Sequence, residues 1–99
     1  MKLIVGKNDS GKTRELIRYS LDKDIPIFAL YSSKAESIRA KSINYFGKLV
    51  KVLTPNDIAQ NSYTGDLLVD DIENVFTALL SDFVKSPGIT IAGATITED

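Results

Sequence analysis

The 99-residue chain contains no cysteine and no histidine. The lack of cysteine excludes disulfide bonds and thiolate zinc sites. The lack of histidine, together with that of cysteine, excludes the Ser/His and Cys/His arrangements of nucleophilic enzymes. Any chemistry must therefore use carboxylates, hydroxyls, lysines, arginines and a bound metal.

An excess of charge and long apolar runs are also missing. Twelve basic and 13 acidic residues leave a formal net charge of −1, so no general attraction to nucleic acid or to an acidic membrane is expected. The lysines are scattered, which argues against a nucleic-acid groove and makes nucleic acid a weakly supported partner. No apolar run is long enough to cross a membrane, and no signal peptide is recognisable. We expect one cytoplasmic domain over residues 1–99, with no membrane contact.

A phosphate-binding pattern is present near the start of the chain. The pattern G-x-x-x-x-G-K-[ST] is matched by Gly6, Lys7, Asn8, Asp9, Ser10, Gly11, Lys12 and Thr13. A short apolar strand at residues 1–5 precedes it and a helix follows, as a phosphate loop requires. Without this context, the same residues would form only a glycine-rich turn with a surface lysine.

Each constrained position of the loop has a physical role. Gly6 and Gly11 permit backbone conformations in which successive N–H groups surround a phosphate at a helix N-terminus. Lys12 is expected to reach the β- and γ-phosphates and Thr13 to ligate Mg²⁺. The carboxylate of Asp9 opposes phosphate binding unless Lys7 or a metal offsets it.

A second informative stretch is the apolar run 67–69, which ends in Asp70 and Asp71. After such a strand, one carboxylate commonly lies near Mg²⁺ and the next orients the attacking water. We therefore assign Asp70 to the metal and Asp71, as a catalytic residue beside Lys12, to the water. The alternative is that both acids begin the next helix and suit its dipole.

Strands and helices alternate along the chain. This order predicts an α/β three-layer sandwich around a mostly parallel sheet of about five strands, with ligands at the carboxyl edge. Gly6, Tyr31, Thr54, Asp70 and Thr95 should lie along that edge. The predicted strands are residues 1–5, 26–31, 48–53, 67–69 and 89–94; the predicted helices are residues 12–22, 33–46, 55–60 and 73–85; residues 95–99 are expected to fray.

Local signals predict how three of these helices begin or end. Ser33 and Glu36 have the spacing of a capping box, and Gly47 suits a helix C-terminus. Thr54 followed by Pro55 suits a helix N-terminus. For the buried side of residues 33–46 the periodicity indicates Ile38, Ser42 or Ile43, Tyr45 and Phe46.

Three motifs together resemble the first RecA-like domain of helicases and related ATPases, and more distantly thymidine kinase. They are the loop ending Ser-Gly-Lys-Thr, the acidic stretch Leu-Val-Asp-Asp-Ile-Glu and the later Gly93-Ala94-Thr95. The resemblance implies a P-loop NTPase fold, binding of ATP and Mg²⁺, and Thr95 as a sensor of the γ-phosphate. The chain also differs from the family pattern, because it has Asp71 at the position where glutamate is usual.

The resemblance implies a MgATP-binding protein, with slow ATP hydrolysis in a nucleic-acid-related process. An oligomer or partner protein would have to supply an arginine finger, because no second RecA-like domain is found and Arg14, Arg18 and Arg39 have the spacing of solvated surface. One alternative is a non-catalytic adaptor that keeps a degenerate loop. Another is a small nucleoside-type kinase, for which no lid or nucleoside-binding insertion is found.

Overall fold

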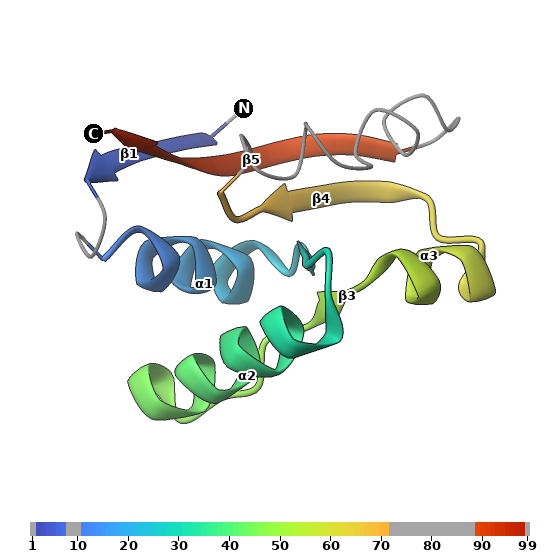
Figure 1. Ribbon diagram of the computed structural model, residues 1–99, viewed down its shortest axis with the longest axis horizontal. Coiled ribbons are helices and arrows are strands. Elements are labelled where there is room, and N and C mark those ends of the chain that lie inside the picture. The colour runs from blue at the N-terminus through green and yellow to red at the C-terminus, as the bar shows by residue number, and fades with distance from the viewer. Residues whose placement is uncertain (1, 8–10, 72–88, 99) are drawn as a thin grey trace.

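The computed structural model describes residues 2–7, 11–71 and 89–98. These residues form three helices and one five-stranded sheet, in which every strand pairing is parallel and the order is β1-β5-β4-β2-β3 (Figure 1). The elements are β1 (Lys2–Lys7), α1 (Lys12–Lys23), β2 (Ile27–Phe28), α2 (Ser32–Phe46), β3 (Val52–Leu53), α3 (Pro55–Asn61), β4 (Gly65–Val69) and β5 (Ile89–Glu98). The predicted α/β class and the parallel sheet of about five strands are confirmed.

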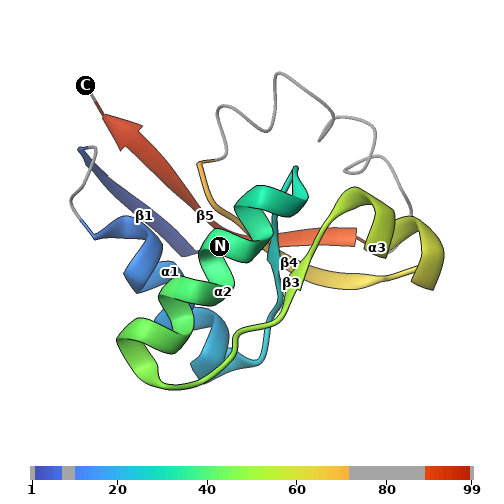
Figure 2. The same ribbon diagram turned by 60° about the horizontal axis from the view of Figure 1, so that its bottom comes forward.

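Two hydrophobic clusters lie on opposite faces of the sheet because side chains alternate along each strand. Leu16 and Ile17 of α1 pack with Ile38 of α2 against one face. Ile58 of α3 packs against the other face, in the cluster that contains Phe28. Figure 2 shows α1 and α2 side by side along the sheet. The described helices thus cover both faces, as in a three-layer sandwich.

The chain order explains this distribution of helices. The connections from β1 to β2 and from β2 to β3 run in one direction across the sheet, whereas the connection from β3 to β4 runs back. Because crossovers between parallel strands are right-handed, α1 and α2 belong on one face and α3 on the other. Among the described residues, no helix has both the length and the apolar character needed to cross a membrane.

The end of β5 differs from the prediction. Thr95 was expected at the end of a strand, before a frayed tail, but β5 continues to Glu98 and pairs with β1. Ile4 is level with Thr95 and Gly6 with Thr97, so β1 also extends two residues beyond its predicted end at Val5. Each strand supplies the hydrogen-bonding partner that the other needs. Local strand propensity does not contain this information, because it depends on the neighbouring strand.

The start and the buried side of α2 were also predicted incorrectly in part. The helix begins one residue early, after Tyr31, and no side chain caps it, so the capping box at Ser33 is wrong. Ser42 rather than Ile43 is buried, and Tyr45 is exposed. Gly47 ends the helix with φ 65°, as predicted.

The start of α3 follows the sequence prediction closely, whereas two strands do not. The side chain of Thr54 accepts a hydrogen bond from the backbone N–H of Asp57, whose carboxylate accepts one from the N–H of Thr54. With Pro55 in the first turn, this cap starts α3 as predicted. Strands β2 and β3 are shorter than predicted. The helix predicted at residues 73–85 lies outside the described residues.

Candidate functional site

The N-terminus of α1 lies at the carboxyl edge of the sheet. Gly11 precedes the helix in the left-handed region, with φ 84°, where a side chain would be strained although space is available. Lys12 and Thr13 then form the first turn, and Lys12 is only 9 % exposed. Gly6 lies in β1 rather than in a loop, and only the backbone of Lys7 is described. Asn8, Asp9 and Ser10 lie outside the described residues.

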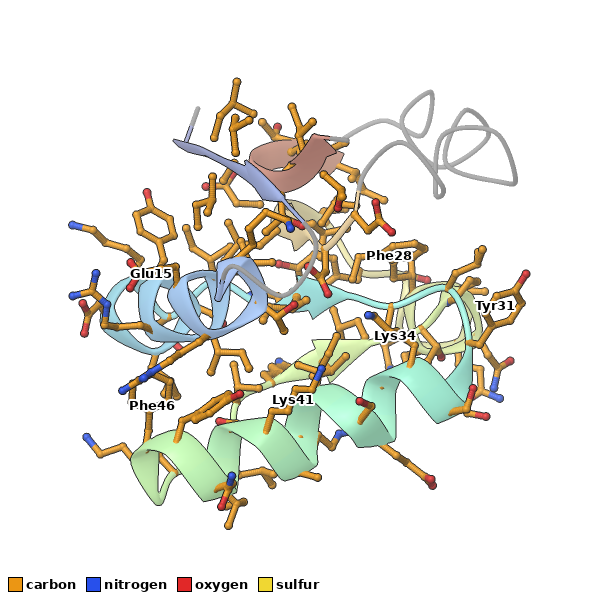
Figure 3. All side chains as sticks on the ribbon, turned by 60° about the vertical axis from the view of Figure 1, so that its left-hand side comes forward. Glu15, Phe28, Tyr31, Lys34, Lys41 and Phe46 are labelled. Carbon is orange, nitrogen blue, oxygen red and sulfur yellow. The ribbon has the colours of Figure 1, made fainter. Side chains whose placement is uncertain are left out.

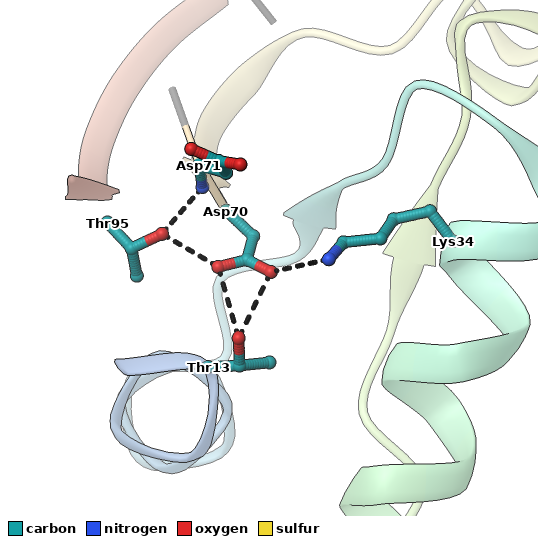
Figure 4. A network of polar contacts seen from close by, with 5 residues as sticks. All are labelled: Thr13, Lys34, Asp70, Asp71 and Thr95. Carbon is teal, nitrogen blue, oxygen red and sulfur yellow. Dashed lines mark hydrogen bonds and ion pairs between the residues drawn. The ribbon is translucent and has the colours of Figure 1, made fainter. Parts of the chain in front are cut away.

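Asp70 is the centre of a polar network directly after β4 (Figure 4). The Thr13 hydroxyl lies 3.3 Å from Asp70 Oδ1 and 3.2 Å from Oδ2, as a donor shared between the two carboxylate oxygens. These residues are 57 positions apart in the sequence. The Asp70 side chain is 6 % exposed, and a buried carboxylate needs such partners because burial removes its hydration. The predicted Thr13 and Asp70 pair is therefore brought together.

Thr95 joins the two acids from β5. Its side chain is completely buried, and its hydroxyl donates a hydrogen bond of 2.7 Å to Asp70 Oδ1. The Thr95 hydroxyl oxygen in turn accepts a hydrogen bond of 2.5 Å from the backbone N–H of Asp71. Thr95 thus holds the Asp70 carboxylate and the Asp71 backbone together, while its predicted contact with a γ-phosphate stays a prediction.

Asp71 adopts a conformation that few residues other than glycine adopt. Its φ is 56°, in the left-handed region, which aspartate tolerates better than most residues. The chain therefore turns sharply immediately after Asp70, and Asp71 lies at the same cavity as Asp70. Whether Asp71 also starts the next helix stays open, because residues 72–88 lie outside the described part.

Lys34 is a member of the site that the motifs did not indicate. Its ammonium lies 3.2 Å from Asp70 Oδ2, and its side chain is 42 % exposed (Figure 4). Lys34 lies in the first turn of α2, the helix that follows β2. A signal was available, because the carboxyl ends of β2 and β4 were both predicted to lie at the same edge of the sheet.

A cavity of about 330 Å³ connects these residues. It extends from Thr97 and Thr95 on β5, past the first turn of α1, to Lys41 and Tyr45 on α2. Figure 3 shows Lys34 and Lys41 extending from α2 into the space beside α1. The charged residues that line the cavity are Lys12, Arg14, Lys34, Lys41, Asp70 and Asp71.

The described lining is therefore positive overall, with four cationic side chains and two carboxylates. A cleft that is lined mainly by charges of one sign and has low-dielectric walls focuses the electric field and raises the local concentration of a counter-ion. The cavity suits an anion with several negative charges, even though the whole chain carries only −1.

Two of the three arginines, Arg14 and Arg18, are exposed as predicted, whereas Arg39 is half-buried. Arg14 lines the cavity, with its guanidinium 5.2 Å from the centre of the Tyr45 ring. Arg39 donates a hydrogen bond to the carbonyl oxygen of Val52. Arg18 forms an exposed ion pair with Glu15. The Arg14 contact follows from the packing of α1 on α2, which single-helix periodicity does not report.

The site residues fit a Mg²⁺ ion that a phosphate ligand helps to hold. Among the described residues there is no cluster of three or more carboxylates that could bind a metal alone. Mg²⁺ usually takes one or two carboxylates together with waters and phosphate oxygens, at about 2.0–2.1 Å, so neighbouring ligand oxygens lie about 2.9 Å apart. The separation of 3.2–3.3 Å between Thr13 and Asp70 is close to this value. The hydroxyl and the carboxylate can therefore serve as two neighbouring ligands.

Comparison of the chain with models of known protein families, with curated proteins and with solved structures gave no match.

Proposed function

We propose that the protein binds a nucleoside triphosphate with Mg²⁺ at the carboxyl edge of its sheet, as a small P-loop domain of the RecA-like type. The observation that carries the proposal is the contact between Thr13 and Asp70, two residues assigned to the metal on separate sequence motifs. A glycine-rich turn with an unrelated surface lysine gives no reason for this contact. Ligands of parallel α/β sheets bind at this edge, which supports the same proposal.

The first turn of α1 is the part that binds phosphate. Gly11 lets the chain enter the helix so that backbone N–H groups and the positive end of the helix dipole face the cavity. Lys12 supplies a cation to the β- and γ-phosphates. The roles of Asn8, Asp9 and Ser10 in cradling the phosphates stay predictions.

Thr13 and Asp70 would hold Mg²⁺ between them and the phosphates. The bound ion supplies neutralisation of the negative charge that develops on the phosphoryl oxygens. Thr95 keeps the Asp70 carboxylate oriented through its hydrogen bond to Oδ1. ATP is proposed over GTP on the family resemblance and the lack of an Asn-Lys-x-Asp sequence.

Hydrolysis of the nucleotide is the activity that fits the acid pair best. Asp71 follows Asp70 at the cavity, and in the proposed reaction its carboxylate orients the attacking water. The side chain is one methylene shorter than glutamate, and a misplacement of that size costs on the order of a hundredfold in rate. We therefore propose slow turnover, which an oligomer or a partner protein accelerates by supplying an arginine.

The shape of the cavity favours a small kinase as a second candidate. Beyond Asp70 the cavity continues to Lys41 and Tyr45, a space where a phosphate acceptor could lie. Transfer to such an acceptor rather than to water would leave the nucleotide site unchanged. A non-catalytic adaptor, by contrast, needs neither the cavity nor the polar network.

Calorimetric titration tests the proposal. MgATP, MgADP and MgGTP are titrated into the wild type and into Lys12→Ala and Lys23→Ala variants. Lys23 is the last residue of the same helix, at the end opposite to Lys12. Its variant therefore removes the same charge from α1 at a distance from the site. We expect micromolar binding of MgATP that Lys12→Ala weakens at least tenfold and Lys23→Ala preserves. No heat with any nucleotide, or equal losses in both variants, contradicts the proposal and favours the adaptor.

Phosphate release distinguishes the remaining activities. The wild type and an Asp71→Asn variant are incubated with MgATP alone, with DNA and with candidate nucleoside acceptors. Hydrolysis that Asp71→Asn abolishes supports the ATPase, and stimulation by DNA supports a nucleic-acid-related process. Phosphorylated nucleoside without free phosphate indicates the kinase.

A further inference from the structure

Lys34 and Thr13 approach the same carboxylate oxygen from two different helices. The Lys34 ammonium lies 3.2 Å from Asp70 Oδ2, and the Thr13 hydroxyl lies 3.2 Å from that atom as well. Asp70 is almost completely buried, whereas 42 % of the Lys34 side chain is exposed. The carboxylate is thus fixed while the ammonium, on a flexible four-carbon stem, has room to move.

The position of Lys34 in α2 is unfavourable for the helix itself. Lys34 is the third residue of α2, whose first turn contains no acidic residue and no side-chain cap. A cation near a helix N-terminus is opposed by the helix dipole. The ion pair with Asp70, rather than the stability of α2, therefore accounts for a lysine at this position.

The Lys34 ammonium competes with the proposed metal for Asp70. Thr13 and Asp70 are the protein ligands that fit Mg²⁺, and Oδ2 is one of the two oxygens available. A second cation against the same atom is strongly repelled. Lys34 must therefore leave Asp70 when the metal binds, and the cavity that it lines with Lys12 leads to the proposed phosphates.

We propose that Lys34 is a tethered cation that neutralises Asp70 in the empty site and moves to the outermost phosphate when the metal-bound nucleotide enters. The inference rests on the proposed function. It identifies within this chain a positive group beside the terminal phosphate, which the sequence motifs did not reveal and which phosphoryl transfer uses to stabilise charge. It also makes nucleotide binding without metal depend on Lys34.

The test measures how strongly Mg²⁺ increases ATP affinity. ATP binding is measured by calorimetry with Mg²⁺ and with EDTA, for the wild type and for Lys34→Met, Lys34→Arg and Lys41→Met. Lys41 lies seven residues along the same helix, lines the same cavity and forms no ion pair with any described residue. Its variant therefore removes the same charge from the same cavity without releasing Asp70.

Lys34→Met is expected to weaken ATP binding in EDTA while Mg²⁺ recovers most of the affinity. The ratio of the two affinities should rise on the order of fivefold above that of Lys41→Met, a modest coupling between two sites. Lys34→Arg should stay close to the wild type because it keeps the charge. Equal ratios in the two methionine variants overturn the inference, because any cation in the cavity would then act alike.

Mg²⁺ without nucleotide is a second probe. If Lys34 competes for Asp70, the metal alone raises the unfolding temperature of Lys34→Met more than that of the wild type or of Lys41→Met. The same shift in all three proteins overturns the competition. A wild type that binds no ATP in either condition refutes the proposed function itself, whereas normal ATP binding with unchanged ratios refutes only the role of Lys34.

Discussion

Replacing Thr95 with valine removes one hydroxyl from the middle of the polar network and keeps the shape of the side chain. The wild-type hydroxyl donates to the Asp70 carboxylate and accepts from the Asp71 backbone N–H. Thr95 is completely buried, so water cannot take the place of the hydroxyl without a change in packing. Thr95→Val therefore leaves Asp70 Oδ1 without this donor and the Asp71 N–H without this acceptor.

The expected cost follows from these two bonds. A hydrogen bond to a charged group contributes about 1.5–3 kcal/mol, and an unsatisfied buried donor costs about 1–3 kcal/mol. Asp70 keeps its contacts with Thr13 and Lys34, and Asp71 is only half-buried, so the lower part of the combined range applies. We expect Thr95→Val to lower the free energy of unfolding by about 2–3 kcal/mol. In a domain of this size the unfolding temperature then falls by roughly 10–20 °C.

Urea unfolding and thermal unfolding, both followed by circular dichroism, measure this loss. Thr95→Ser is the control, because it keeps the hydroxyl and loses only a methyl group, at a cost of about 1 kcal/mol. The order of stability should be wild type, serine, valine. A valine variant as stable as the serine variant would show that the hydroxyl makes no net contribution, and the reasoning about the network would fail.

Three further predictions concern helices α2 and α3. Ser42→Ala removes a buried hydroxyl that bonds to the backbone after α2, so urea unfolding should show a loss of about 1–3 kcal/mol, against no loss if the hydroxyl is dispensable. Gly47→Ala forces a side chain into the left-handed region at φ 65° and should cost about 1–2 kcal/mol in the same measurement, whereas an unchanged midpoint would contradict this strain. Hydrogen bonds from the backbone and side chain of Thr54 lower the pKa of Asp57 below 3.8, so its stabilisation is complete above pH 3.8 and disappears as the pH falls through the lowered pKa. Unfolding of Asp57→Asn between pH 2 and 6 should lack this part of the acid sensitivity, and a pH profile equal to that of the wild type would refute the linkage.

The position of the site was predictable because it follows from general rules of parallel sheets. Gly11, Thr13 and Asp70 meet at the carboxyl edge, as the alternation of strands and helices required. The cap at Thr54 and the left-handed Gly47 were likewise predictable, because each depends on a few neighbouring residues.

Features that depend on contacts between distant elements were not predictable in this way. Lys34 joins the site because the start of α2 lies close enough to the end of β4 for its ammonium to reach Asp70. Ser42 is buried instead of Ile43 because its hydroxyl finds backbone partners after the helix, at Lys48 and Val50. Hydrophobicity alone does not anticipate a buried polar group whose hydrogen bonds are satisfied.

The irregular pairing of β5 with β4 shows how such contacts position the site. Leu67 is level with Ile91, whereas Leu68 is level with Gly93, so one extra residue, Ala92, is inserted in β5. Because side chains alternate between the two faces, an insertion of one residue moves every later side chain to the opposite face. Ile91 accordingly packs on the face that α3 covers.

Beyond the insertion, Thr95 lies on the other face, the one that α1 covers. Val69 is level with Ala94, so Thr95 follows level with Asp70, and α1 brings Thr13 to the same carboxylate. Continued without the insertion, the pairing of Leu67 with Ile91 would place Ala94, which has no hydroxyl, level with Asp70. The hydrogen bond between Thr95 and Asp70 thus depends on the pairing of two strands that are separate in the sequence. Residues 89–98 taken alone look like a plain β-branched strand and do not contain this information.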